Sequence, residues 1–204
     1  MSKYLVVLVA LLIAAPSFAE LTTNLGTANK FMFRGIKQSD QDLIVQGGVD
    51  YQGPLGFYTG AWAYTGSIED FDTSEVNAYA GLAYDLGPVA FGIGAITYER
   101  GGDKLDNTEY HGSIAWDAYR YSYFEDSDEA HVYQELALNY DFWDNAGMGF
   151  TAGLYTPEEG KERWDWSTSL VMGLPSKTDF EVLITNHQRK GYSLTLGFTR
   201  QFDW

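Results

Sequence analysis

Alternation of apolar and polar residues runs through most of this chain, and it constrains the fold more than any other feature. In the C-terminal segment, Leu194, Leu196, Phe198 and Phe202 are separated by polar or small residues, with Arg200 as the one break. A period of two is the geometry of a β-strand with one apolar and one polar face. We find about twelve such segments and predict an all-β fold. They are 20–33, 43–52, 57–66, 75–86, 88–99, 108–116, 118–124, 131–142, 147–155, 164–173, 179–187 and 192–203.

The connections between these segments alternate in length. Five are tight, at 53–56, 86–88, 116–118, 143–147 and 174–178. Six are mostly longer and polar, at 34–42, 67–74, 100–107, 125–130, 156–163 and 188–191. Transmembrane barrels have short periplasmic turns, longer outer loops and strands of about ten residues. We therefore predict a transmembrane antiparallel up-and-down β-barrel of about 12 strands, within a range of roughly 10 to 14.

Aromatic residues gather near both ends of the predicted strands. We expect these two levels to be the girdles that mark the two membrane interfaces. The set beside the short turns includes Tyr51, Tyr58, Trp116 and Phe180. The set beside the longer loops includes Phe31, Phe33, Tyr64, Tyr98, Tyr133, Trp164 and Tyr192.

The N-terminal stretch has the features of a secretory signal. Lys3 precedes an apolar run from Tyr4 to Ala15, Pro16 breaks the run, and small residues stand at 17 and 19. We predict a signal peptide at 1–19 that is cleaved after Ala19 and one barrel domain at 20–204. The expected location is the outer membrane of a Gram-negative cell, reached through the periplasm.

The charge and the absence of cysteine exclude several function classes. The chain has 28 acidic against 13 basic residues, a formal net charge of −15, which disfavours nucleic-acid binding because such affinity comes from cations on phosphates. There is no cysteine, so disulfides, thiol catalysis and thiolate metal sites are absent. We expect no cofactor. The expected partners are outer-membrane lipids, small solutes or ions, and the barrel-assembly machinery.

Alternate residues of each predicted strand share a face, and one of the two faces carries most of the charged residues. We expect this charged face to line the barrel interior. A dry core would make each such charge cost several kcal/mol, whereas a water-filled lumen removes that cost. The acidic excess of this face predicts a cation preference. The predicted pore-lining residues are Lys30, Arg34, Asp50, Asp85, Arg120, Glu135, Asp141, Asp165, Glu181 and Asp203.

The first outer loop, 34–42, carries Arg34 and Lys37 among otherwise acidic loops. The interpretation we favour is a solvated turn in which Gly35 supplies backbone freedom. The alternative is that Arg34 folds toward the lumen and narrows the pore.

The C-terminal pattern is similar to the signal by which outer-membrane barrels are recognised for assembly. That signal is a terminal aromatic residue with apolar residues at alternate positions before it. It predicts an assembly role for Leu196, Phe198, Phe202 and Trp204, from which Arg200 departs.

His111 and Ser113 are the best enzyme signal, because residues two apart on a strand share a face. The pair resembles the His-x-Ser of outer-membrane phospholipases and lipid A deacylases. Here, however, the pair faces inward, and only Glu109 offers an acid to orient the imidazole. We therefore expect no catalytic residues.

Metal binding is not expected either. His111, His131 and His187 lack ligand spacing. Asp126, Asp128 and Glu129 are better read as a solvated acidic loop than as a loose calcium site.

The stretch from 31 to 64 resembles the opening of the TorF family of proteobacterial porins. The matching pieces are Phe33-Arg34-Gly35-Ile36, Gln38-Ser39-Asp40, 46–51 (QGGVDY), and Gly56-Phe57-Tyr58 with Gly60 and Trp62. The resemblance implies an outer-membrane porin without an established substrate. The leading hypothesis is a porin for passive diffusion of small hydrophilic solutes. The alternatives are a lipid hydrolase using His111 and Ser113, a non-conducting structural or adhesive barrel, and a soluble lipocalin-like barrel.

Overall fold

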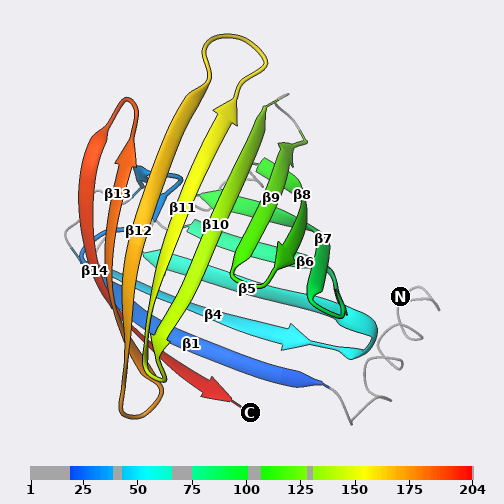
Figure 1. Cartoon of the computed structure of the whole chain (residues 1–204), viewed down its shortest axis with the longest axis vertical. Helices are drawn as coiled ribbons and strands as arrows, with labels where there is room; N and C mark the ends of the chain where they lie inside the picture. Colours follow the sequence, from blue (N-terminus) through cyan, green and yellow to red (C-terminus); the bar gives the residue numbers. More distant parts are fainter. Residues whose placement is uncertain (1–18, 39–42, 66–74, 101–106, 128–130, 204) are drawn as a thin grey trace.

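The computed structural model describes residues 19–38, 43–65, 75–100, 107–127 and 131–203. Twelve strands form a closed antiparallel barrel, which closes where β1 pairs with both β4 and β14 (Figure 1). The predicted fold class is confirmed. The barrel strands are β1 (Glu20–Ala28), β4 (Ile44–Gln52), β5 (Phe57–Thr65), β6 (Glu75–Leu86), β7 (Val89–Arg100), β8 (Asn107–Trp116), β9 (Tyr119–Asp126), β10 (Val132–Trp143), β11 (Ala146–Thr156), β12 (Arg163–Leu174), β13 (Thr178–His187) and β14 (Gly191–Asp203).

The connections differ between the two ends of the barrel. At one end they are tight: a single 3-10 turn, η1 (Pro54–Gly56), joins β4 to β5, and Asp117 and Ala118 alone join β8 to β9. The C-terminus lies at this short-turn end (Figure 1). The opposite, long-loop end carries the wider connections, of which 66–74, 101–106 and 128–130 fall outside the described residues. The predicted signal peptide also lies outside them, apart from Ala19.

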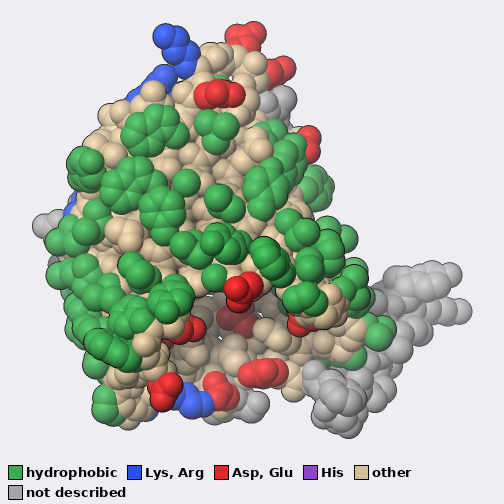
Figure 2. Space-filling model, viewed as in Figure 1, with side chains coloured by type: hydrophobic (Ala, Val, Ile, Leu, Met, Phe, Trp, Pro, Cys, Tyr) green, Lys and Arg blue, Asp and Glu red, His purple; other side chains and the backbone are tan. Residues whose placement is uncertain are grey.

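Register and burial sort the wall into two faces. Cross-strand partners share a face, so the pairing of Leu82 with Ile93 puts both on the exterior, where Ile93 is 62% exposed. Leu136, Leu194 and Leu196 are likewise exposed. Figure 2 shows apolar side chains spread over the outside of the wall. Such an apolar surface is what a transmembrane barrel presents to lipid.

No helix in the described part of the chain has the length and apolar character to span a membrane.

The first predicted strand is too long, and the structure shows why. β1 ends at Ala28, and residues 31–38 form a separate hairpin of β2 (Met32–Phe33) and β3 (Ile36–Lys37). Its two central residues, Arg34 and Gly35, have φ of +49° and +72°, which suits a tight two-residue hairpin turn. We call residues 31–38 the inward hairpin, because its tip lies inside the barrel. A Cβ added at Gly35 would be 2.9 Å from the Cβ of Asp165 on β12. The favoured prediction of a solvated turn is therefore wrong.

The predicted outer aromatic girdle is correct only in part. Trp164 and Tyr192 are exposed on the exterior, as a girdle requires. Tyr64, Tyr98 and Tyr133 are buried in the interior, at 4%, 6% and 2% exposure. These inward tyrosines pack around the inward hairpin instead of meeting the membrane surface.

Candidate functional site in the barrel lumen

Aromatic contacts tie the inward hairpin to one side of the wall. Phe31 stacks on Trp62 and Tyr64 of β5, with ring centroids 5.0 and 4.3 Å apart. Phe33 packs edge-on against Tyr98 of β7 at 5.9 Å. Apolar residues in an outer loop thus find an apolar environment inside the barrel. The hairpin is packed against the wall, not suspended in the lumen.

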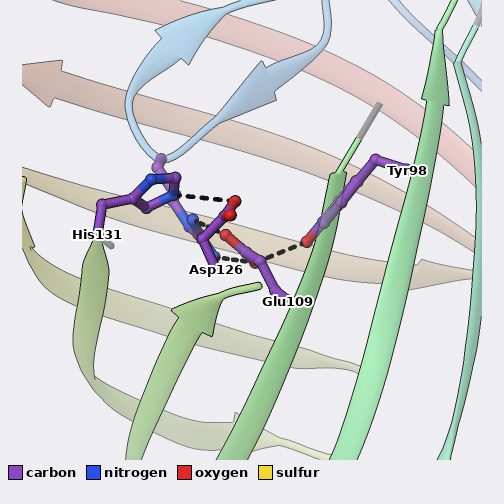
Figure 3. Close-up of polar contacts among 5 residues, drawn as sticks. Tyr98, Glu109, Asp126 and His131 are labelled. Carbon is purple, nitrogen blue, oxygen red and sulfur yellow. Dashed lines mark hydrogen bonds and ion pairs between the residues drawn. The ribbon is translucent and has the colours of Figure 1, made fainter. Parts of the chain in front are cut away.

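Arg34, at the tip of the hairpin, forms a bidentate ion pair with Glu109 of β8. Both terminal guanidinium nitrogens donate to the two carboxylate oxygens at 2.7 Å. The two side chains are only 14% and 3% exposed. Tyr98 donates a further hydrogen bond to Glu109 at 3.0 Å (Figure 3). Charge-assisted bidentate pairs are among the strongest polar contacts in proteins, so this pair fixes the hairpin tip.

Arg34 also lies over aromatic rings. Its guanidinium carbon is 4.1 Å from the ring centroid of Tyr133 on β10 and 4.9 Å from that of Phe124 on β9. Cation–π contacts of this kind strengthen when water is excluded. Together with the contact of Gly35 to β12, they make the hairpin cross the lumen. Arg34 therefore lies in the lumen and narrows it, as in the alternative prediction for this residue.

The predicted pore-lining residues all take inward positions. Register places Asp85 opposite Ala90, Arg120 opposite Ala115 and Ala137, and Asp141 opposite Gly147. Lys30, just after β1, donates to Ser193 of β14. The remaining inward strand positions are Asp50, Glu135, Asp165, Glu181 and Asp203, and Arg34 enters through the hairpin.

Several of these residues have partners that the sequence did not reveal. Tyr79 of β6 donates to Asp50, and Lys177, in the turn after β12, pairs with Asp203 at the short-turn end. The acidic excess is larger than predicted. The described inward positions also include the acids Glu20, Glu75, Glu109, Asp126 and Asp179, against Arg163 and the register position of Arg100 on the basic side.

A wide cavity occupies the short-turn end of the barrel. It measures about 880 Å³ and is lined by residues of β10–β13, among them Asn139, Asp141, Ser169 and Asp179. Figure 2 shows the surface hollowed toward this end, with acidic side chains around the opening. The lumen is thus wide and acidic between the inward hairpin and the short-turn end, and it is narrow beside the hairpin.

Glu109, Asp126 and His131 converge near the long-loop end (Figure 3). Each offers one metal-ligand atom, and these atoms lie within 4.8 Å of one another. The Nε2 of His131 is 3.4 Å from a carboxylate oxygen of Asp126. Because Arg34 already binds both oxygens of Glu109, a metal ion would have to displace a guanidinium. We read this group as the outer part of the Arg34 ion-pair network. Sequence spacing did not reveal it, since Glu109 lies on β8, Asp126 ends β9 and His131 directly precedes β10.

Among the residues that the structure describes, the His111 and Ser113 pair lacks the acid partner that a hydrolase triad has. Both residues face inward, as predicted, opposite Gly94 and Gly92. The Nε2 of His111 is 2.9 Å from the hydroxyl of Tyr58, and its Nδ1 has no hydrogen-bond partner among the described residues. Glu109, the predicted orienting acid, binds Arg34 instead. An imidazole with no orienting acid lacks the third member that nucleophile activation requires.

The C-terminal strand shows the predicted facing of its apolar residues. Leu196 and Phe198 of β14 are 41% and 47% exposed on the exterior. Arg200 and Phe202 take the next two outward positions. The guanidinium carbon of Arg200 lies 5.1 Å from the centroid of the Phe202 ring. Trp204 lies outside the described residues, and the assembly role of this strand stays a prediction.

The fold and its lumen define the class: a small β-barrel with an apolar exterior and a polar, acidic interior. Residues 13–193 match the model of a bacterial protein family of unknown function, Gcw_chp, and the chain belongs to this family. No curated protein matches the sequence. The family model carries no porin name, so the resemblance to the TorF family stays a prediction.

Solved porin structures share the architecture. The KdgM porin aligns with a TM-score of 0.63 at 9% identity, covering 90% of this chain and 99% of that chain. KdgM in complex with disordered oligogalacturonate aligns at 0.60, with 10% identity over 90% and 99% of the two chains. The NanC porin aligns at 0.59, with 11% identity over 88% and 97%. Identities this low show a shared fold alone.

Proposed function

We propose that this protein is an outer-membrane channel for passive diffusion of small hydrophilic solutes, with a preference for cations. The observation that supports the proposal most is the lining of the lumen. Its inward positions carry far more carboxylates than basic groups, while the exterior is apolar. A channel wall of one sign concentrates counter-ions in a low-dielectric surround. The same acidic wall disfavours polyanions, so the oligogalacturonate found with KdgM is not the kind of solute we expect here.

The proposal includes the route to the membrane. A signal peptide at 1–19 would export the chain to the periplasm of a Gram-negative cell, where the apolar side of β14 with Trp204 would present it to the barrel-assembly machinery. The exterior would then contact outer-membrane lipids. We expect no cofactor and no enzymatic role.

Conductance and ion selectivity of the purified protein test the proposal. In planar bilayers with asymmetric KCl, we expect discrete channels and a reversal potential of the sign that K⁺ permeation gives. Replacing Asp141 and Asp179 by Asn should move the reversal potential toward zero, because both carboxylates line the wide cavity. Glu125→Gln is the matched control, since Glu125 is exposed on the exterior face of β9. A reversal potential of the opposite sign would refute the cation preference.

One observation favours a second candidate, a structural barrel that does not conduct. The inward hairpin crosses the lumen and packs against opposite parts of the wall. If the hairpin never leaves this position and no path remains beside it, the recordings will show no channels. The absence of conductance in both the native protein and an Arg34→Ala variant would therefore favour the structural barrel.

A further inference from the structure

A small chamber lies between the inward hairpin and the wall of β10–β13. Its volume is about 150 Å³. Arg34 and Gly35 lie on the hairpin side of it, with Met32, and Leu183 supplies an apolar part of the wall. The rest of its lining is rich in oxygen atoms. The oxygen-bearing side chains are Tyr133, Glu135, Thr151, Asp165, Ser167 and Thr185.

The two carboxylates of the chamber lack a cation of their own. Asp165 is 6% exposed and accepts a hydrogen bond from Tyr133 at 3.2 Å. Neither Asp165 nor Glu135 has a salt bridge within the described part of the chain. The nearby guanidinium of Arg34 is already bound through both terminal nitrogens to Glu109. Asp165 is buried and Glu135 is half-buried. Carboxylates in such surroundings are costly without a counter-charge of their own, so a positive group in the chamber would be favoured.

Thr185 gives an independent indication of an occupant. It is 3% exposed and lines the chamber from β13. Its hydroxyl has no hydrogen-bond partner among the described residues. Buried hydroxyl groups are nearly always satisfied, because an unmade hydrogen bond costs free energy. A group held in the chamber, whether water or a ligand, would supply the partner of this hydroxyl.

We propose that this chamber binds one compact monovalent cation, either an alkali-metal ion with part of its hydration shell or a primary ammonium group. Carboxylate and hydroxyl oxygens are the ligands that hard cations prefer, and an ammonium donates hydrogen bonds to the same atoms. At roughly 30 Å³ per water, the chamber holds about five water volumes, which leaves room for an ion that keeps part of its hydration shell. The inference rests on the proposed cation-preferring channel, in which this site would be the binding step beside the constriction.

Binding can be measured without conduction. The full-length protein in detergent is titrated with NaCl, and then with methylammonium chloride, at an ionic strength held constant with tetramethylammonium chloride. Sodium NMR linewidths report Na⁺ binding, and calorimetry reports both ligands. We expect saturable binding of at least one of them. Competition between the two ligands identifies the kind of site. If methylammonium does not displace Na⁺, the site is specific for a metal ion, and if Na⁺ does not displace methylammonium, it is specific for an ammonium group. Full competition indicates that the same site binds both.

Three variants locate the site. Asp165→Asn should weaken binding by about tenfold or more, because a charged ligand is lost. Thr185→Val keeps the shape of the side chain and should weaken binding several-fold, and it serves if Asp165→Asn fails to fold. Glu181→Gln is the matched control, an inward carboxylate of β13 that does not line the chamber, and should bind like the native protein.

The result that overturns the inference is the absence of saturable binding of either ligand, or equal weakening in Glu181→Gln and Asp165→Asn. This failure is distinct from a failure of the proposed channel. If the protein conducts cations but shows no saturable site, the proposed channel stands and the cation site in the chamber is refuted. If the protein binds Na⁺ or methylammonium in detergent but shows no channels, the cation site stands and the proposed channel is refuted.

Discussion

Removing the guanidinium of Arg34 should release the inward hairpin from the lumen. Arg34→Ala leaves the carboxylate of Glu109, whose side chain is 3% exposed, with Tyr98 as its remaining hydrogen-bond donor. Breaking a buried ion pair by removing one partner costs about 3–5 kcal/mol, and the lost cation–π contacts add roughly 0.5–2 kcal/mol. All these contacts join the hairpin to the wall. The cost therefore falls on hairpin docking and not on the barrel.

The expected population shift follows from this energy. Each 1.4 kcal/mol changes an equilibrium about tenfold, so a loss of 3 kcal/mol raises the undocked fraction about a hundredfold. Because the native chain has no cysteine, Met32→Cys provides a unique thiol on the hairpin. We expect a membrane-impermeant maleimide to label this thiol about a hundredfold faster in the Arg34→Ala background. Channel conductance should rise in the same variant.

Two further variants make the measurement specific. Glu109→Gln added to Arg34→Ala removes the uncompensated charge, so it should recover part of the docking energy and slow the labelling relative to Arg34→Ala alone. Lys177→Ala removes the exposed ion pair to Asp203, whose side chains are 62% and 47% exposed, and should change labelling little, since such pairs contribute at most about 1 kcal/mol. Equal labelling rates in Arg34→Ala and its parent would refute the anchoring role of Arg34.

Three shorter predictions address the wall and the chemistry. Gly153→Ala should lower the free energy of unfolding by about 1–3 kcal/mol in urea titrations, because its new Cβ would overlap the hydroxyl of Tyr133. Gly112→Ala should not lower it, because the nearest atom to the new Cβ is 3.9 Å away. Equal stability of the two variants would contradict the close approach of Tyr133 to Gly153. Ile93→Arg should cost about 2–4 kcal/mol in lipid vesicles if the exterior meets hydrocarbon, and no change would argue against a membrane location. Ser113→Ala should leave conductance unchanged and phospholipid hydrolysis at background, and a loss of hydrolysis relative to the native protein would revive the enzyme hypothesis.

The wall of the barrel was predictable from the sequence because successive residues of a strand point alternately outward and inward. Whether a wall residue takes an odd or an even position in its strand therefore decides its environment. The predicted segments 43–52 and 192–203 match Ile44–Gln52 and Gly191–Asp203 closely. A strand with one apolar face keeps a period of two whatever lies beyond that face. The tight turns were equally local, since two or three residues decide them.

The inward hairpin was not predictable from parity, because its pattern is also alternating. Phe31 and Phe33 continue the alternation of β1, so the same rule extended the first strand beyond Ala28. The period does not distinguish an apolar face that meets lipid from one that meets the aromatic interior. The partner of Arg34 lies 75 residues away on β8, and no local signal connects the two. The one available hint was an apolar loop flanking Arg34-Gly35, where a solvated loop would be polar.

Glycine beside tyrosine on a neighbouring strand explains how so narrow a barrel holds both a hairpin and a polar path. Tyr79 lies against Gly60 on the neighbouring strand, where an added Cβ would be 2.6 Å from the ring carbon that bears the hydroxyl. Tyr133 covers Gly153 in the same way. A ring that lies flat over a glycine occupies the wall instead of the lumen, and its hydroxyl reaches a carboxylate, Asp50 or Asp165. The tyrosines thereby donate hydrogen bonds to inward acids while leaving space at the centre. The inward hairpin occupies this space near the long-loop end, and the space stays open near the short-turn end.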